Sequence, residues 1–265
     1  MSNLENFGKR QNSFTGTFGT GQVKFITANE TFVVPSGISS VRVRVWGAGG
    51  HNPTGGTAKG GGGGGGFAIK TITGLTSGSS IAVTVGTSGG ASSSFGAYVS
   101  ATGGSNSNTA TGGAGGSGVG GDINNTGGSG GDNNNVNAYG AGGGGASYFG
   151  GGGNALDDPA QRSFGFIGGA VGASKSFSNT STRPANNIRF YSDVRKFDSF
   201  DWSDLDYICT GASAIDDGVT GTSLTENFNG AGGSGFVYGA FPAGGGGNPF
   251  GGMNTFGGGL VVVEY

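Results

Sequence analysis

Cysteine and histidine are almost absent from this 265-residue chain, which contains one of each. A single cysteine, Cys209, excludes an intrachain disulfide, and one cysteine with one histidine cannot make a zinc site unaided. We interpret Cys209 as a small buried hydrophobic residue rather than a reactive thiol. A Ser–His–Asp triad would require His51, whose Gly, Asn and Pro neighbours indicate a turn, so we interpret His51 as a solvated loop residue.

Charge is also scarce. Charged residues make up 11% of the chain and its net charge is −2. The sequence has no cluster of Lys and Arg that could bind the phosphates of a nucleic acid, so nucleic-acid binding is disfavoured. The polar opening, Met1 to Asn6, lacks the apolar stretch of a secretory signal, and no apolar run is long enough to span a membrane. We therefore expect synthesis in the cytoplasm without a signal peptide, and release by lysis.

Proline is rare and glycine dominates, with 6 prolines and 66 glycines. Collagen requires glycine at strict third positions and abundant proline, so it is excluded. The glycine runs could form a flexible linker. Alternatively, they could form a stack of polyglycine II helices, which turn once in about three residues and hydrogen-bond laterally to one another. We favour the stack, because runs of similar length alternate with turn-sized polar segments and aromatic residues lie among them.

Short β-strands are predicted at both ends of the chain. Residues 41–46 alternate strictly, so their valines should share one face, with Arg42, Arg44 and Trp46 on the other. Residues 259–265 form an apolar stretch that needs a sheet partner, and the N-terminal strands provide one. The other strands expected are 23–27, 31–34, 67–72, 81–85 and 95–99.

The predicted fold is mainly β with little α-helix: a small β-sandwich-like framework from the N- and C-terminal strands, with an inserted stack of polyglycine II helices and loops. Within the 154–228 region, residues 186–228 alone carry 8 of the 15 acidic residues, and the region holds many aromatics. The regions are an attachment arm (1–22), a β-framework with the first glycine run (23–104), a polyglycine II region (105–153), an aromatic and acidic insertion that is the candidate binding region (154–228), and a glycine-rich return with the closing strand (229–265).

Catalytic motifs are not found. The glycine run 60–66 ends in Phe67 and lacks the Gly-Lys-Ser/Thr of a phosphate-binding loop. Residues 127–132 match the start of a calcium-binding β-roll repeat, but Asn134 replaces the required apolar residue and tandem copies are absent. Calcium binding by the acids of 193–217, and paired carboxylates for glycoside cleavage, stay open. We predict no enzyme, assign no cofactor and assign no metal site.

Several short motifs follow one another in a distinctive order. The first is an aromatic residue and a Val-Pro-x-Gly turn, then an alternating valine strand that ends in Gly-Ala-Gly-Gly. A poly-Gly run, a short strand and a glycine-bounded turn come next. The stretches concerned are 32–37, 41–50, 67–69, 83–86, 101–104 and the closing Gly-Leu-Val-Val-Val-Glu-Tyr of 259–265. Together, in this order, they resemble glycine-rich tail proteins of bacteriophages.

The resemblance implies a tail-fibre or tail-tip component of a virion. It is similar in style to the tip adhesins of T-even-like phages, whose layered polyglycine II helices carry receptor-binding loops. The implied partners are a bacterial surface protein or glycan, and other tail or virion proteins that bind the N-terminal arm; a homotrimer is one option. Aromatic side chains suit glycan stacking or protein recognition, although each could instead fill a core. The candidate receptor-binding residues are Tyr139, Phe197, Phe200, Trp202 and Tyr207.

Three other functions compete with adhesion. A purely structural virion component, such as a fibre joint or capsid decoration, would place the function in the arm of residues 1–22. An ice-binding protein would need a flat face of regularly spaced Thr or small residues, which the acidic and aromatic insertion argues against. A lytic or depolymerising enzyme lacks a residue signature in this chain.

Overall fold

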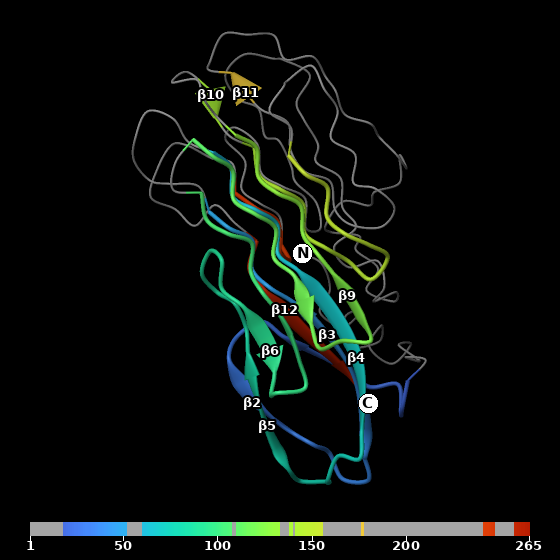
Figure 1. The fold of residues 1–265 in the computed structure, drawn as a ribbon. Coiled ribbons are helices and arrows are strands. Elements are labelled where there is room, and N and C mark those ends of the chain that lie inside the picture. The colour runs from blue at the N-terminus through green and yellow to red at the C-terminus, as the bar shows by residue number, and fades with distance from the viewer. Residues whose placement is uncertain are drawn as a thin grey trace, which may run out of the picture.

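Figure 1 shows the computed structural model of the protein, whose described residues are 18–51, 60–107, 110–132, 138–139, 141–155, 176–177, 241–246 and 257–265. Within these ranges the chain forms β-strands and extended segments, and no α-helix. The same ranges contain no helix with the length and apolar character needed to cross a membrane. The mainly β fold predicted from the sequence is confirmed.

Most strands belong to two five-stranded antiparallel sheets (Figure 1). The first sheet consists, in order, of β1 (Val23–Ile26), β12 (Leu260–Glu264), β3 (Ser40–Trp46), β4 (Phe67–Thr73) and β9 (Ile123–Asn125). The second consists of β2 (Glu30–Val33), β5 (Ser80–Thr84), β6 (Ser93–Phe95), β7 (Val99–Ala101) and β8 (Gly118–Val119). Because β12 pairs with both β1 and β3, the prediction that the two ends of the chain build one framework is confirmed.

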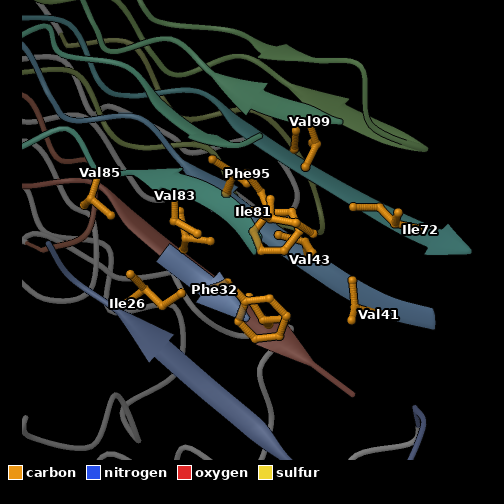
Figure 2. Packing of buried hydrophobic residues seen from close by; sticks show 14 of the residues in the cluster. Ile26, Phe32, Val41, Val43, Ile72, Ile81, Val83, Val85, Phe95 and Val99 are labelled. Atoms are coloured by element: carbon orange, nitrogen blue, oxygen red, sulfur yellow. The ribbon is translucent and has the colours of Figure 1, made fainter. Parts of the chain in front are cut away.

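The two sheets pack face to face around an apolar core, seen from close by in Figure 2. The alternation along β3 places Val41, Val43 and Val45 in this core with no exposed surface, as predicted. Phe32 of β2 and Phe95 of β6 pack together with ring centroids 5.5 Å apart. Fully burying a side chain of this kind contributes about 2 kcal/mol relative to leaving it exposed, so this layer is held by ordinary side-chain packing.

The strand predicted over 95–99 is wrong. β6 ends at Phe95 and β7 begins at Val99, and the residues between them turn the chain so that Phe95 and Val99 pair across adjacent strands. Gly96 has a φ of 52°, a left-handed conformation that glycine adopts without steric cost. The Tyr98 N–H closes the turn by donating to Phe95 O at 3.2 Å. The two apolar residues therefore mark the ends of two strands rather than one continuous strand.

The outer face of the first sheet is buried as well. Trp46, Phe67 and Val262 form a second apolar cluster there, together with residues from beyond the strands such as Ala146. The indole Nε1 of Trp46 donates to Ala146 O at 3.0 Å, so its polar atom is satisfied although the side chain is fully buried. This cluster joins the sheet to the glycine-rich part of the chain.

A buried ion pair lies on the same face. Arg44 of β3 and Glu264 of β12 are only 3% and 2% exposed, and the guanidinium donates to the carboxylate. Arg42, two residues earlier, places its guanidinium carbon 4.8 Å from the ring centroid of Phe18. The predicted sharing of this face by Arg42, Arg44 and Trp46 is confirmed, and burial of Arg44 explains why a carboxylate faces it from the last strand.

The glycine runs extend the sandwich as a bundle of parallel and antiparallel segments (Figure 1). Segment 60–66, the central segment, leads into β4. Its successive N–H groups donate to three different neighbours, and the same neighbour recurs after three residues. Gly61 and Gly64 donate to Gly131 and Gly128 of one such neighbour, at 2.9 and 2.8 Å. The remaining bonds are Gly62 to Gly246, Gly65 to Ala243, Gly63 to Ser105 and Gly66 to Thr102.

This period of three, with lateral bonds in place of internal ones, is that of polyglycine II. Three neighbouring segments accept bonds from the central segment and three others donate to its carbonyl groups. The six neighbours also bond to one another in the order of the sequence, and the last bonds to the first, which closes a ring. In that order the ring segments are 47–51, 102–107, 112–117, 126–131, 141–147 and 242–246. The predicted polyglycine II stack is therefore present in the described residues.

Glycine occupies the positions that face a neighbouring segment. A Cβ at Gly63 would overlap the backbone carbonyl of Ala114, and one at Gly113 would overlap that of Ser105. Positions that face out of the ring carry small or polar side chains instead, and these are at least partly exposed. They recur at every third residue as Thr102 and Ser105, as Thr111, Ala114 and Ser117, and as Thr126, Ser129 and Asp132.

Substitution of Gly113 by alanine is expected to lower the free energy of unfolding by about 2–3 kcal/mol. The added methyl group overlaps the Ser105 carbonyl, and the bond from Gly113 N–H to Gly61 O, 2.8 Å long, must lengthen to make room. Ala114→Ser, one residue along on the outward face, is the matched control and should change stability by less than about 0.5 kcal/mol. Urea unfolding of both variants checks this. Equal stabilities would contradict the close lateral hydrogen bonding of the glycine segments, which is here called the lattice.

Substitution of Glu264 by glutamine is expected to destabilise the fold by about 3 kcal/mol, because the charge of Arg44 then stays buried without its counter-charge. The double variant Arg44→Met/Glu264→Leu removes both charges and should recover most of the loss. Denaturant midpoints of the single and double variants measure the effect. A double variant as unstable as Glu264→Gln would show that packing, rather than charge, sets the cost.

Candidate functional site at the distal end of the bundle

The bundle gives the molecule two unlike ends. At one end Tyr265 exchanges two backbone hydrogen bonds with Gln22, both 3.0 Å long, so the first and last described residues lie together on the sandwich. At the opposite end, here called the distal end, the glycine segments finish (Figure 1). The chain leaves the described bundle at the distal end after His51, Ser107, Asp132, Ala155 and Gly246.

Side-chain oxygens accept hydrogen bonds from backbone N–H groups where the lateral lattice runs out. Asp132 Oδ1 accepts from the Gly112 N–H at 2.7 Å. Asn106 Oδ1 accepts from the His51 N–H at 3.0 Å. Within the bundle, a backbone carbonyl of the neighbouring segment would accept these bonds, and here the two side-chain oxygens take its place. The N–H groups of Gly112 and His51 are therefore hydrogen-bonded although the glycine segments end.

His51 was expected to be a solvated loop residue. The structure places it at the last described position of segment 47–51, half-buried, with its carbonyl accepting from the Ser107 N–H at 3.0 Å. The backbone of His51 is thus part of the lattice, which accounts for the reduced exposure of this residue.

Tyr139 lies at the distal end. It belongs to β10 (Ala138–Tyr139), which pairs antiparallel with β11 (Ser176–Phe177) beyond the bundle (Figure 1). This pairing brings a part of the long stretch that follows Ala155 against the connection between Asp132 and Ala141. The other predicted receptor-binding residues lie outside the described part of the chain, as does Cys209: they are Phe197, Phe200, Trp202 and Tyr207.

The stretch considered as the start of a calcium-binding repeat has a different place in the structure. Residues 127–131 belong to a ring segment, and the Asp132 carboxylate accepts a backbone hydrogen bond. In the described ranges, no group of three or more His, Cys, Asp or Glu residues is arranged to hold a metal ion. The stretch therefore serves the bundle, as a ring segment that ends in a side chain bonded to the neighbouring Gly112.

The aromatic candidates stay predictions, and the sequence analysis missed the side chains that complete the backbone hydrogen bonding at the end of the bundle. Asp132 was considered only as part of a calcium-binding repeat and Asn106 was not considered, although the sequence holds a signal for the role of Asp132. Asp132 follows Thr126 and Ser129 at the same spacing of three, so it continues the outward-facing series to the last residue of its run. A polar residue that ends a small-Gly-Gly repeat can thus be recognised as a cap.

A β-sandwich extended by a bundle of polyglycine II helices defines the structural class of the described residues. The model of the glycine-rich domain family matches residues 26–265, from the last residue of β1 to the C-terminus. The chain therefore belongs to this family of glycine-rich domains. A search of curated proteins finds no match to the chain.

Substitution of Asp132 by alanine is expected to speed hydrogen exchange of the Gly112 amide several-fold, because a net hydrogen bond of about 1 kcal/mol is lost at an exposed position. Asp132→Asn keeps an acceptor oxygen at the same place and should exchange like the wild type. Amide exchange followed by NMR distinguishes the two variants. Equal exchange in Asp132→Ala and wild type would show that the carboxylate does not protect Gly112.

Proposed function

We propose that this protein is a phage tail-fibre or tail-tip adhesin, which binds a protein or glycan on the bacterial surface through the connections at the distal end of its bundle. The observation that carries the proposal is the opposition of the two ends. The first and last described residues meet on the sandwich, whereas the bundle segments finish at the other end. An adhesin needs this separation, because one end joins the virion and the other faces the host.

The scaffold suits recognition by loops. Inside the ring, neighbouring segments are joined by backbone hydrogen bonds of 2.7–3.1 Å, so the positions of the segments do not depend on the connections. Loops held by a rigid scaffold can change in sequence without loss of the fold, and binding residues concentrate in such loops. A surface that must follow changes in a bacterial receptor benefits from this independence.

The residues suited to recognition fall in the connections. The stretch that leaves the bundle after Ala155 contains Trp202 and Tyr207 within an aromatic and acidic sequence. Tyr and Trp are over-represented among residues that dominate binding energy at interfaces. The pairing of β11 with β10 supports a contribution of this stretch to the same end as Tyr139.

The sandwich end is the proposed site of attachment to other tail or virion proteins. The described chain begins there at Phe18, beside Arg42, and Thr20 Oγ1 donates to Tyr265 O at 2.8 Å. Residues 1–17, most of the proposed attachment arm, precede this point in the sequence. The phage-like motifs at 32–37 and 41–50 support a place in the tail of a virion.

Labelled protein is expected to bind intact candidate host bacteria saturably and to block infection by the virus. Trp202→Ala and Tyr207→Ala should each weaken binding about tenfold or more, as truncation of an aromatic anchor does at interfaces. Tyr98→Ala is the matched control, since Tyr98 is 42% exposed on the sandwich, and it should bind like wild type. Thermal melting of each variant controls for folding.

Three other outcomes of the binding experiment are informative. Binding that survives Trp202→Ala and Tyr207→Ala but is lost in Tyr139→Ala would keep the adhesin and move its site. Absence of binding to every strain that the virus infects would overturn the adhesin proposal. If deletion of residues 1–17 then prevented incorporation into particles, the protein would be a structural virion component.

A further inference from the structure

A long stretch in the first half of the chain carries no charge. Residues 71–121 contain no Asp, Glu, Lys or Arg, whereas 11% of the whole chain is charged. The described residues of this stretch form β5, β6, β7 and β8 of the second sheet and the ring segments 102–107 and 112–117. Charged side chains next to the stretch, such as Lys70 and Asp122, belong to β4 and to the turn before β9 instead.

The outer face of the second sheet is exposed, unlike that of the first sheet. Side chains alternate along β5, so that Ile81 and Val83 lie in the core (Figure 2) while Ala82 and Thr84 point outward and are exposed. The outer face of the first sheet is instead buried around Trp46. One side of the sandwich is thus covered, and the other is accessible to a partner.

This accessible surface continues from the sheet onto the bundle. Segment 102–107 directly follows β7, and segment 112–117 directly precedes β8. The outward positions of both segments hold small, uncharged side chains that are at least partly exposed. The outer face of the second sheet together with these outward positions is here called the open face. It therefore runs along both the sandwich and the bundle.

The two most exposed large hydrophobic side chains of the described residues lie on the open face. Val33 is 54% exposed and Val119 is 50% exposed. Val33 follows Phe32, whose side chain points into the core, and Val119 is paired with Ser100, which lies between two core residues of β7. Both valines therefore point outward. They stand on β2 and β8, the two edge strands, so apolar surface is present at both edges of the sheet.

The hydroxyl groups on the bundle part of the open face are bonded within the chain. Thr102 Oγ1 accepts from the Ser117 N–H at 2.8 Å and donates to Ser117 O at 3.4 Å. Ser117 Oγ lies 3.3 Å from Thr126 Oγ1, within hydrogen-bond distance. A partner that covers these groups leaves their bonds in place, so they lose less on removal from water than hydroxyls that bond to water alone.

We infer that the open face is the interface between two copies of this chain, packed face to face with their strands aligned to within about 30°. Charge decides the occupant. A charged partner surface would lose water on the open face without gaining a counter-charge. Around a two-fold axis, moreover, residues near the axis meet their own copies, which repel when they are charged. An uncharged face avoids both costs when it meets itself. The inference does not require the proposed function.

The size of the open face fits a reversible dimer. Five strands about 4.8 Å apart, each presenting about three residues with a rise of about 3.3 Å, cover roughly 250 Å². Two glycine segments of about seven residues, with a rise of about 3.1 Å, add roughly 200 Å². Because side chains roughen the surface, two copies bury about 1,000 Å² of accessible area, which is the lower end for a specific interface.

Sedimentation velocity of the full chain tests the inference. The mass should rise reversibly from 25.7 kDa to twice that value as the protein concentration is raised to about 1 mM. Thr84→Glu places like charges on the two facing copies and should raise the Kd of the dimer about tenfold or more. Thr73→Glu is the matched control, since it makes the same change at an exposed position of β4 in the first sheet, and it should leave the Kd unchanged.

Three results would overturn the inference. They are a monomer at every concentration, a dimer that Thr84→Glu leaves intact, and a trimer or larger assembly, which face-to-face packing of one surface does not allow. A monomer would leave the open face to a different protein. No receptor is involved, so these outcomes are independent of the cell-binding result.

A second measurement needs no variant and therefore does not depend on the folding of Thr84→Glu. A soluble paramagnetic gadolinium chelate broadens the NMR signals of exposed methyl groups. As the concentration rises through the Kd, the methyl groups of Val33 and Val119 should become protected, whereas the exposed methyl group of Thr73 should stay broadened. Protection of Thr73 with both valines still broadened would place the interface on the first sheet and contradict the inference.

Discussion

The lateral hydrogen bond between two glycine backbones is the constraint on which the rest of this structure depends. A polyglycine II helix has no internal hydrogen bonds, so each of its peptide groups must find a partner on a neighbouring segment. Ordering glycine is also entropically expensive, which makes an isolated helix unstable. Both conditions are met when a central segment, 60–66, is enclosed by a closed ring of neighbours. The bundle therefore forms as a set of segments together.

The sandwich provides what the glycine segments lack. Glycine has no side chain to specify which segment pairs with which, whereas Val43 or Phe95 fits only one face of one strand. Segment 47–51 directly follows β3 and segment 60–66 directly precedes β4. Because β3 and β4 are paired in a fixed register, they set where these two segments enter the bundle. The Trp46 bond to Ala146 joins the two layers. Side-chain packing thus sets the arrangement, and backbone bonding makes it rigid.

The same division explains where function can reside. Residues of the central segment are restricted to glycine by close approach, so they cannot carry recognition chemistry. The outward series, such as Thr111 and Ala114, accepts side chains but holds only small ones in this chain. At the distal end, the side chains of Asp132 and Asn106 finish the backbone bonding. In the adhesin that we propose, scaffold and recognition would be separated along the length of the molecule.

The sequence by itself determined the mainly β fold, the sharing of one sheet by both ends and the presence of a polyglycine II stack. These follow from local patterns, namely the alternation of 41–46 and the runs of glycine. Only the tertiary structure decided that Phe95 and Val99 belong to two strands, and that Glu264 pairs with Arg44. Only it decided the order of the segments around 60–66, since glycine runs are alike in sequence. The pairing of the strands that flank the segments decides which segments are neighbours. These strands are far apart in the sequence, so no local pattern predicts their pairing.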